Sequence, residues 1–224
     1  MTSLKEFVDV LNDTRVTLNE LTRQGSDTVE AGPLSKNVAV KNLVKRISSI
    51  TTGAIVGYGS KDLYLSELGV RTEMDGTLTI NEKTFNSQLD SDSTVFDAIF
   101  NTMFSSGSSY LKVEGSTATS NPTPGQYSYI NDGSSVKLDG LAMTSTTDAS
   151  GNTYYVSSGT AANTAGIKIT EAQTVSSAYI YFGKSLIDQL TDYIDDSLSS
   201  KGTLNKSEAT ASNDLLDLNM DLIN

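Results

Sequence analysis

Glu67-Leu-Gly-Val-Arg-Thr-Glu-Met-Asp-Gly-Thr-Leu-Thr-Ile-Asn-Glu-Lys-Thr-Phe85 is the stretch that decides the fold of this chain. Two short segments of alternating apolar residues flank Asp75-Gly76, and this dipeptide is typical of a β-hairpin because the turn needs positive φ. Asn81 then precedes a helical pattern, and its side chain can accept a hydrogen bond from the first free amides of a helix. The stretch therefore predicts a hairpin over residues 68–80 and a helix directly after it.

The same stretch also matches part of the order of a calcium-binding EF-hand loop. If Arg71 is position 1, Asp75 is position 5, Gly76 is position 6 and Glu82 is position 12. Arg71, however, places a cation where the first carboxylate ligand belongs. We therefore expect a plain hairpin here and no metal site.

Apolar residues recur with helical spacing on both sides of the hairpin. Helices are predicted over residues 3–23, over residues 40–50 with Gly53 as the stop, and again from Ser185. Gly202 is expected to break that helix, and a last helix follows it. Ser93 is expected to cap a further short helix. Leucines seven apart on the first helix, and spaced by three and four on the last, are typical of coiled-coil seams. We expect these seams to supply oligomer or partner contacts through Leu4, Leu11, Leu18, Leu215, Leu218 and Leu222.

The composition changes at Ser105. From there to about residue 182 the charge density falls, and Gly, Ser, Thr and Tyr dominate. Turn signals such as Asp139-Gly140 separate short runs of β-forming residues, which predicts a small antiparallel β domain. The runs cover residues 110–113, 126–130, 136–138, 153–156, 167–170 and 178–182.

The expected fold class is therefore α+β. An antiparallel helical bundle with a β-hairpin, made from residues 1–104 and 183–224, is interrupted by the β domain of residues 105–182. The apolar positions that we expect to be mostly buried are Leu11, Leu18, Val40, Leu43, Ile47, Leu68, Leu78, Ile80, Phe85, Phe100, Leu186 and Leu190.

Tyrosines two residues apart mark several of the predicted strands, and such pairs point to the same face of a strand. Packing in the core of the β domain is favoured over an exposed aromatic surface for a partner or glycan. The six tyrosines are Tyr127, Tyr129, Tyr154, Tyr155, Tyr179 and Tyr181.

The composition excludes several classes of function. The chain has no Cys, His or Trp, so thiolate and imidazole catalysis and an ordinary structural zinc site are excluded. A net charge of −11 disfavours nucleic acids and anionic membrane surfaces as partners. No apolar run approaches the length of a membrane span, and no signal peptide is expected at Met1. The aspartate clusters fall mostly on solvent sides of helices, so we expect no enzyme, no catalytic residues and no cofactor.

Several segments, taken in order, resemble the C-terminal half of the bacterial flagellar filament cap family, also called flagellar hook-associated protein 2. No segment is unique by itself, and their collinear order carries the resemblance. The resemblance covers roughly residues 3–104 and 183–224, whereas residues 105–182 stand where the common family pattern has a short loop. The segments are residues 7–12, 18–22, 31–34, 67–85, 96–100, 186–190, 193–198, 201–204 and 217–219.

This resemblance implies a structural protein that the flagellar secretion apparatus exports to the tip of the extracellular flagellum. The family assembles into a ring there and promotes flagellin insertion, and some members also contact host surfaces. The partners that it implies are other copies of the chain, flagellin, the hook–filament junction proteins and an export chaperone. The alternative from the residues themselves is a β-rich extracellular adhesin or surface-layer fragment, which would bind glycan or calcium through residues 105–182.

Overall fold

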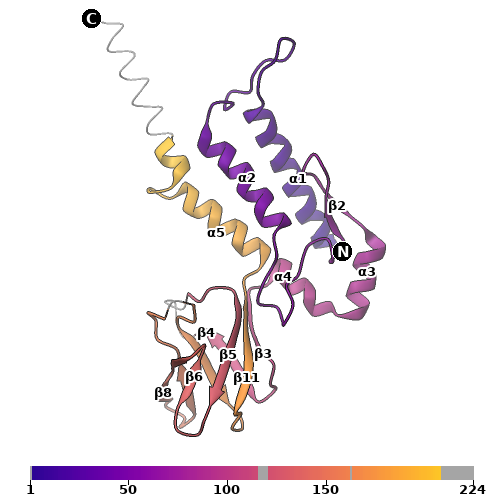
Figure 1. The fold of residues 1–224 in the computed structure, drawn as a ribbon. Coiled ribbons are helices and arrows are strands. Elements are labelled where there is room, and N and C mark those ends of the chain that lie inside the picture. Colours follow the sequence, from indigo (N-terminus) through magenta and orange to yellow (C-terminus); the bar gives the residue numbers. More distant parts are fainter. Residues whose placement is uncertain (1, 116–120, 162, 208–224) are drawn as a thin grey trace, which may run out of the picture. The chain divides into compact units, whose positions relative to one another are not determined.

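The computed structural model describes residues 2–115, 121–161 and 163–207 (Figure 1). The chain forms two compact units. The helical unit takes the described residues of 1–53, 65–88 and 189–224, and the β unit takes those of 54–64 and 89–188. Helices and antiparallel sheets together confirm the α+β class. The division into a bundle of residues 1–104 and 183–224 and a separately folding domain of residues 105–182 stays a prediction.

Two helices that pack against each other form the centre of the helical unit, α1 (Thr2–Thr22) and α2 (Val38–Thr52). Asn37 caps α2, because its side-chain oxygen accepts a hydrogen bond of 3.1 Å from the Val40 amide. Gly53 ends the helix, and its amide donates a hydrogen bond of 3.0 Å to the Ser49 carbonyl.

The decisive stretch forms β1 (Val70–Thr72) and β2 (Leu78–Ile80), followed by α3 (Glu82–Ser91). The two strands pair antiparallel, with Val70 opposite Ile80 and Thr72 opposite Leu78. Gly76 has a φ of 87° in the turn between them, a value that glycine adopts without strain. Asn81 caps α3 by accepting a hydrogen bond of 3.0 Å from the Thr84 amide.

In the β unit, a 3-10 helix, η1 (Ser93–Phe96), leads into α4 (Asp97–Phe100). The expected cap at Ser93 is wrong by one residue. Asp92 takes that role, because its carboxylate accepts hydrogen bonds of 2.9 Å from the Thr94 amide and 2.6 Å from the Thr94 hydroxyl.

Two antiparallel sheets make up most of the β unit. The six predicted runs each coincide with a strand, and β3, β7 and β8 are three strands that the sequence pattern did not predict. The five-stranded sheet has the order β3 (Met103–Ser106), β11 (Ser177–Gly183), β5 (Gly125–Asn131), β6 (Val136–Leu138) and β7 (Leu141–Ala142). The four-stranded sheet has the order β4 (Leu111–Gly115), β10 (Ile167–Glu171), β9 (Thr153–Val156) and β8 (Thr144–Thr147).

The chain passes between the sheets without a long connection. Met143 alone separates β7 from β8, and its amide donates a hydrogen bond of 2.8 Å to the Val136 carbonyl. The first and last strands, β3 and β11, are direct neighbours, with Met103 opposite Gly183. Both sheets contribute to one apolar core, which contains Leu111, Tyr127, Tyr129, Val136, Leu138, Ile167, Ile169, Ile180 and Phe182.

Most of the expected core residues lose nearly all of their exposure. The buried ones are Val40, Ile47, Leu68, Leu78, Phe85, Leu186 and Leu190, and the half-buried ones are Leu11, Leu18, Leu43, Ile80 and Phe100. On α1 the buried positions are Leu4, Val8 and Arg15. At 100° per residue, the half-buried Leu11 and Leu18 lie on the same side of α1 as these three buried positions.

Candidate interaction surfaces

The hairpin is attached to α1 by a side chain that the sequence did not single out. The Asn12 amide group donates a hydrogen bond of 2.9 Å to the Leu78 carbonyl and accepts one of 2.7 Å from the Leu78 amide. Both backbone groups of one β2 residue are thus satisfied by one helix residue. Near the start of α1, Lys5 forms an exposed salt bridge of 2.8 Å with Glu82.

Arg15 is the charged residue in the buried stripe of α1, and only 6% of its surface is exposed. One terminal nitrogen donates a hydrogen bond of 2.9 Å to the Ser48 hydroxyl of α2, whereas Nη1 has no hydrogen-bond partner among the described residues. A Cβ on Gly76 would lie 2.4 Å from Nη1, so the guanidinium packs directly on the hairpin turn.

Burial and nearby charge act in opposite directions at this contact. Burial lowers the pKa of Arg15, and the Asp75 carboxylate opposes that shift. The pKa of Asp75 is lowered, chiefly because its carboxylate accepts hydrogen bonds from the Thr77 hydroxyl and amide. Asp75 is therefore engaged inside its own turn.

The seam predicted on α1 only partly faces outward. Leu4 is 1% exposed and belongs to the interior, while Leu11 and Leu18 are half-buried. Leu215, Leu218 and Leu222 lie outside the described residues. The exposed apolar side chains of this unit lie elsewhere, on Val10, Val16, Val29, Val38, Met74, Ile194 and Leu198.

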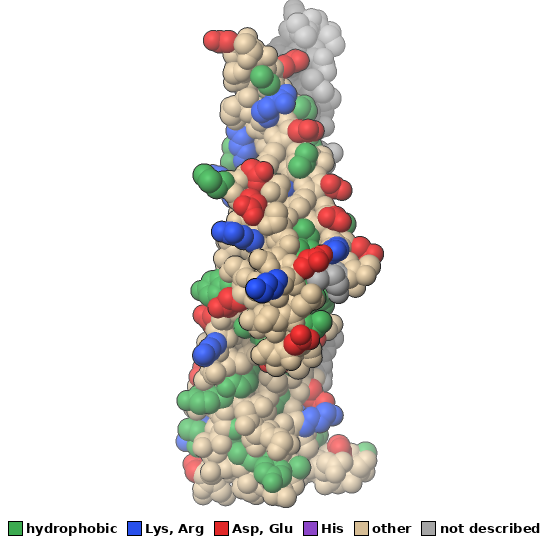
Figure 2. Space-filling model, turned by 90° about the vertical axis from the view of Figure 1, so that its right-hand side faces the viewer, with side chains coloured by type: hydrophobic (Ala, Val, Ile, Leu, Met, Phe, Trp, Pro, Cys, Tyr) green, Lys and Arg blue, Asp and Glu red, His purple; other side chains and the backbone are tan. Residues whose placement is uncertain are grey.

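Charge is distributed differently over the two units. In Figure 2, acidic and basic side chains are mixed over the helices, whereas the strands present few charges and several hydrophobic side chains on this face. This agrees with the low charge density that the sequence shows after Ser105.

A carboxylate joins the two sheets of the β unit. Glu171 at the end of β10 accepts hydrogen bonds of 2.7 Å from the Tyr129 hydroxyl and 3.2 Å from the Asn131 amide group, both on β5. It also accepts a hydrogen bond of 3.2 Å from the Val175 amide. Three donors thus hold the Glu171 carboxylate between the two sheets.

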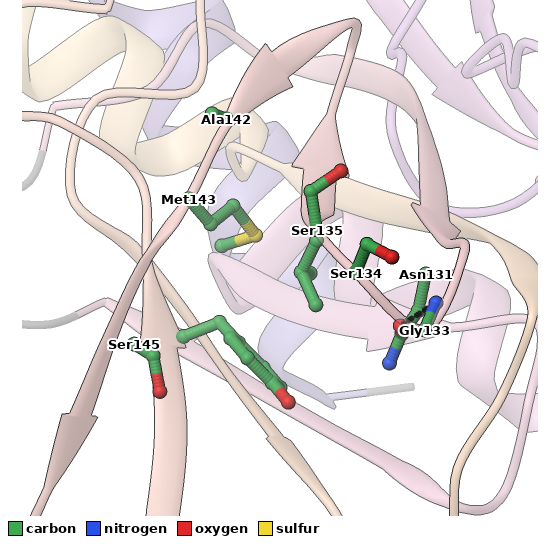
Figure 3. A pocket seen from close by; sticks show the side chains of 9 residues that line it. Asn131, Gly133, Ser134, Ser135, Ala142, Met143 and Ser145 are labelled. Carbon is green, nitrogen blue, oxygen red and sulfur yellow. Dashed lines mark hydrogen bonds between the residues drawn. The ribbon is translucent and has the colours of Figure 1, made fainter.

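A small cavity of about 260 Å³ opens where the chain changes sheets (Figure 3). Its lining includes Ser135, Met143 and Ser145, together with Asn131, which accepts a hydrogen bond of 3.0 Å from the Gly133 amide. None of the described lining residues is charged. The cavity therefore presents hydroxyl and amide groups, among them the phenol of Tyr155.

The tyrosines divide between the two interpretations. Tyr127 and Tyr129 are buried in the core, as packing requires. Tyr179 is 53% exposed, whereas its neighbour Ile180 is buried and pairs with Tyr127. Successive residues of a strand point to opposite faces of the sheet, so Tyr179 lies on the outer face. On the other sheet, Lys168 lies 4.5 Å from the ring centre of Tyr154 and forms a salt bridge of 2.8 Å with Glu114.

Within the described ranges there is no group of three or more carboxylates that could hold a metal ion. The same part of the chain contains no helix that is long and apolar enough to cross a membrane. The features that remain are surfaces: the packed hairpin, the exposed faces of α2 and α5 (Leu186–Leu198), and the outer faces of the two sheets.

Comparison with known proteins gives one finding for the whole chain. The family model described as flagellar hook-associated protein 2 C-terminus matches residues 1–223. The matched range runs through residues 105–182, which the resemblance in sequence had left outside. No match was found among curated proteins or among solved structures. The chain therefore belongs to the C-terminal region of the flagellar hook-associated protein 2 family, structural proteins that cap the flagellar filament and serve in its assembly.

Proposed function

We propose that this chain acts in a cap at the growing end of a bacterial flagellum, where it promotes the polymerisation of flagellin. The observation that carries the proposal is the family match over residues 1–223, because it includes both compact units. The cap assembles as a closed ring of copies of the chain. It lies outside the cell, after export by the flagellar secretion apparatus.

The surface chemistry supports a role in assembly. The net charge of −11 keeps the chain soluble at high local concentration and disfavours nucleic acid. The proposed partners are other copies, flagellin, the hook–filament junction proteins and an export chaperone.

The β unit is proposed to contribute to adhesion through the outer face of its five-stranded sheet. Tyr179 and Ile130 are 53% and 43% exposed there, and they line a groove of about 420 Å³. An exposed aromatic residue beside polar groups is a common element of binding surfaces. The rival interpretation as a free-standing adhesin or surface-layer fragment is not favoured, because the family match covers both units.

Complementation tests the main proposal. The intact protein that carries this chain should restore filament growth to a strain that lacks its cap, and antibodies should detect it at filament tips by electron microscopy. Absence from the tips together with failure of growth would reject the cap role. For adhesion, replacing Tyr179 and Ile130 by Ser should weaken attachment to host cells while filaments grow normally.

A further inference from the structure

Three Asp-Gly pairs occur in this chain, and each lies in a turn between two strands. They are Asp75-Gly76 between β1 and β2, Asp132-Gly133 between β5 and β6, and Asp139-Gly140 between β6 and β7. An aspartate that precedes glycine can isomerise without an enzyme, because glycine has no side chain to hinder its amide nitrogen as that nitrogen attacks the neighbouring carboxyl group. The three turns therefore place the same chemistry in three different surroundings.

At Asp75-Gly76 the fold holds both of the groups that would react. The Asp75 carboxylate accepts hydrogen bonds of 2.9 Å from the Thr77 amide and 2.7 Å from the Thr77 hydroxyl. The Gly76 amide donates a hydrogen bond of 2.9 Å to the Glu73 carbonyl. Neither group can approach the other until these bonds are broken.

Asp132-Gly133 is held in the same way. The Asp132 carboxylate accepts hydrogen bonds of 2.9 Å from the Ser134 amide and 2.8 Å from the Ser135 amide, and these bonds lower the pKa of Asp132. The Gly133 amide donates a hydrogen bond of 3.0 Å to the side-chain oxygen of Asn131. Attack on a carboxyl group requires its protonated form, so a fixed and ionised carboxylate reacts slowly.

Asp139-Gly140 differs at both reacting groups. Both residues are exposed. Within the part of the chain that the structure describes, no hydrogen bond reaches the Asp139 carboxylate and none is donated by the Gly140 amide. A Cβ on Gly140 would have no atom within 4 Å, so there is room in this turn for a new ring.

The strand beside this turn is also weakly held. β7 consists of Leu141 and Ala142, both exposed, and it is an edge strand that pairs with β6. Asp139 has a φ of 53°, the one positive φ of a non-glycine residue in the described ranges, and an L side chain adopts it at a cost. Short, exposed edge pairs open locally at low free energy, which lets the Asp139 carboxyl group turn towards the Gly140 nitrogen.

We propose that Asp139 isomerises spontaneously to isoaspartate, and that it does so faster than Asp75 or Asp132 in the folded protein. The Gly140 nitrogen attacks Cγ of Asp139, an N–C bond forms, and the amide hydrogen leaves with the carboxyl hydroxyl group as water. The product is a five-membered succinimide ring. Water then opens the ring at the former main-chain carbonyl, so that the chain continues through Cγ, or at Cγ, which restores aspartate. Nothing is oxidised or reduced, and the reaction needs water alone.

Isoaspartate adds one methylene group to the main chain of a two-residue turn. Leu138 and Leu141 pair directly across this turn, and just beyond it the Met143 amide donates its hydrogen bond to the Val136 carbonyl. The register of a hairpin is set by the length of its turn, so we expect β7 to pair less tightly with β6 in the modified protein. This inference does not rest on the proposed function, because it concerns the chemistry of one turn.

Ageing of the purified intact protein tests the assignment. The protein is incubated for several weeks at about pH 5, where part of an aspartate is protonated, and is then digested. Mass spectrometry with electron-transfer fragmentation distinguishes the two linkages. The isoaspartate fraction at residue 139 should be at least about fivefold larger than at residues 75 and 132. In guanidinium chloride the three fractions should agree within about twofold, because the difference comes from the fold.

Two variants serve as controls. Asp139→Glu keeps the charge but would require a six-membered ring, so isomerisation at residue 139 should fall below detection. Hydrogen exchange at the Met143 amide should become faster with age in the original protein and stay constant in Asp139→Glu. Thr77→Val removes one donor from the Asp75 carboxylate and should raise the isoaspartate fraction at residue 75, while residue 139 is unaffected.

Three outcomes would overturn the inference. Equal fractions at the three pairs in the folded protein would show that the fold does not select Asp139. A larger fraction at residue 75 or 132 would show that the hydrogen bonds promote the reaction. Absence of isoaspartate at residue 139, when the unfolded protein forms it there, would show that the turn protects Asp139. Constant exchange at the Met143 amide while isoaspartate accumulates would refute the loosening of β7.

Discussion

The hydroxyl group of Tyr129 on β5 donates a hydrogen bond of 2.7 Å to the carboxylate of Glu171 on β10, and this bond connects the two sheets across their core. Tyr129 is completely buried. Tyr129→Phe should therefore destabilise the β unit by about 1–3 kcal/mol, because the half-buried Glu171 carboxylate loses one of its donors. Denaturant unfolding followed by circular dichroism measures the change. Tyr179→Phe, at an exposed position, is the control and should change stability by less than about 0.5 kcal/mol. Equal effects of the two variants would contradict the structural role of the bond.

The same tyrosine predicts a loss of stability in alkali. Burial, with the Glu171 carboxylate adding to it, raises the pKa of Tyr129 far above its ordinary value. The unfolded chain releases this proton near pH 10, whereas the folded chain retains it, so the unfolded state binds fewer protons above pH 10. Stability should consequently fall as the pH rises from about 10, and it should fall less steeply in Tyr129→Phe. Parallel pH profiles of the two proteins would refute this assignment.

Removal of the Asn12 side chain should loosen the hairpin. Asn12→Ala leaves the amide and the carbonyl of Leu78 without their partner, at an expected cost of about 1–3 kcal/mol. Hydrogen exchange should then be faster at the Leu78 amide than in the original protein. Asn19→Ala changes an exposed residue of the same helix and should leave that amide unaffected.

The turn at Gly76 should tolerate no side chain while Arg15 is present. Gly76→Ala combines positive φ with a contact on the guanidinium, and we expect a loss of about 2–4 kcal/mol in thermal or denaturant unfolding. Gly133→Ala has a similar φ of 82° but open space around it, and should lose only about 1 kcal/mol. In an Arg15→Met background the Gly76→Ala penalty should shrink towards that smaller value. An unchanged penalty would show that backbone strain alone accounts for it.

Features set by neighbouring residues were predictable from the sequence. The Asp75-Gly76 turn and the Asn81 cap depend on residues within four positions of each other, and the structure contains both. Strand β8 was not predictable by the same means. Its residues Thr144–Thr147 are exposed on both sides, so they show no alternation of apolar and polar residues.

Long-range contacts account for the other differences. Nothing in the local pattern of α1 shows that Arg15 packs on the hairpin turn, because that contact depends on its distant neighbour Gly76. The change of composition at Ser105 likewise marks where strands begin, but not what packs on them.

Gly57 lies against the backbone of Phe182, since a Cβ on Gly57 would come within 1.8 Å of the Phe182 carbonyl oxygen. Residues 54–64 consequently belong to the β unit, far in sequence from its strands.

The pairing of Met103 with Gly183 holds the two ends of residues 104–182 next to each other. Entry and exit of the intervening polypeptide are held side by side on neighbouring strands, about 5 Å apart between Cα atoms. Any autonomous domain whose own termini lie that close could be grafted between these two positions without stretching the flanking backbone.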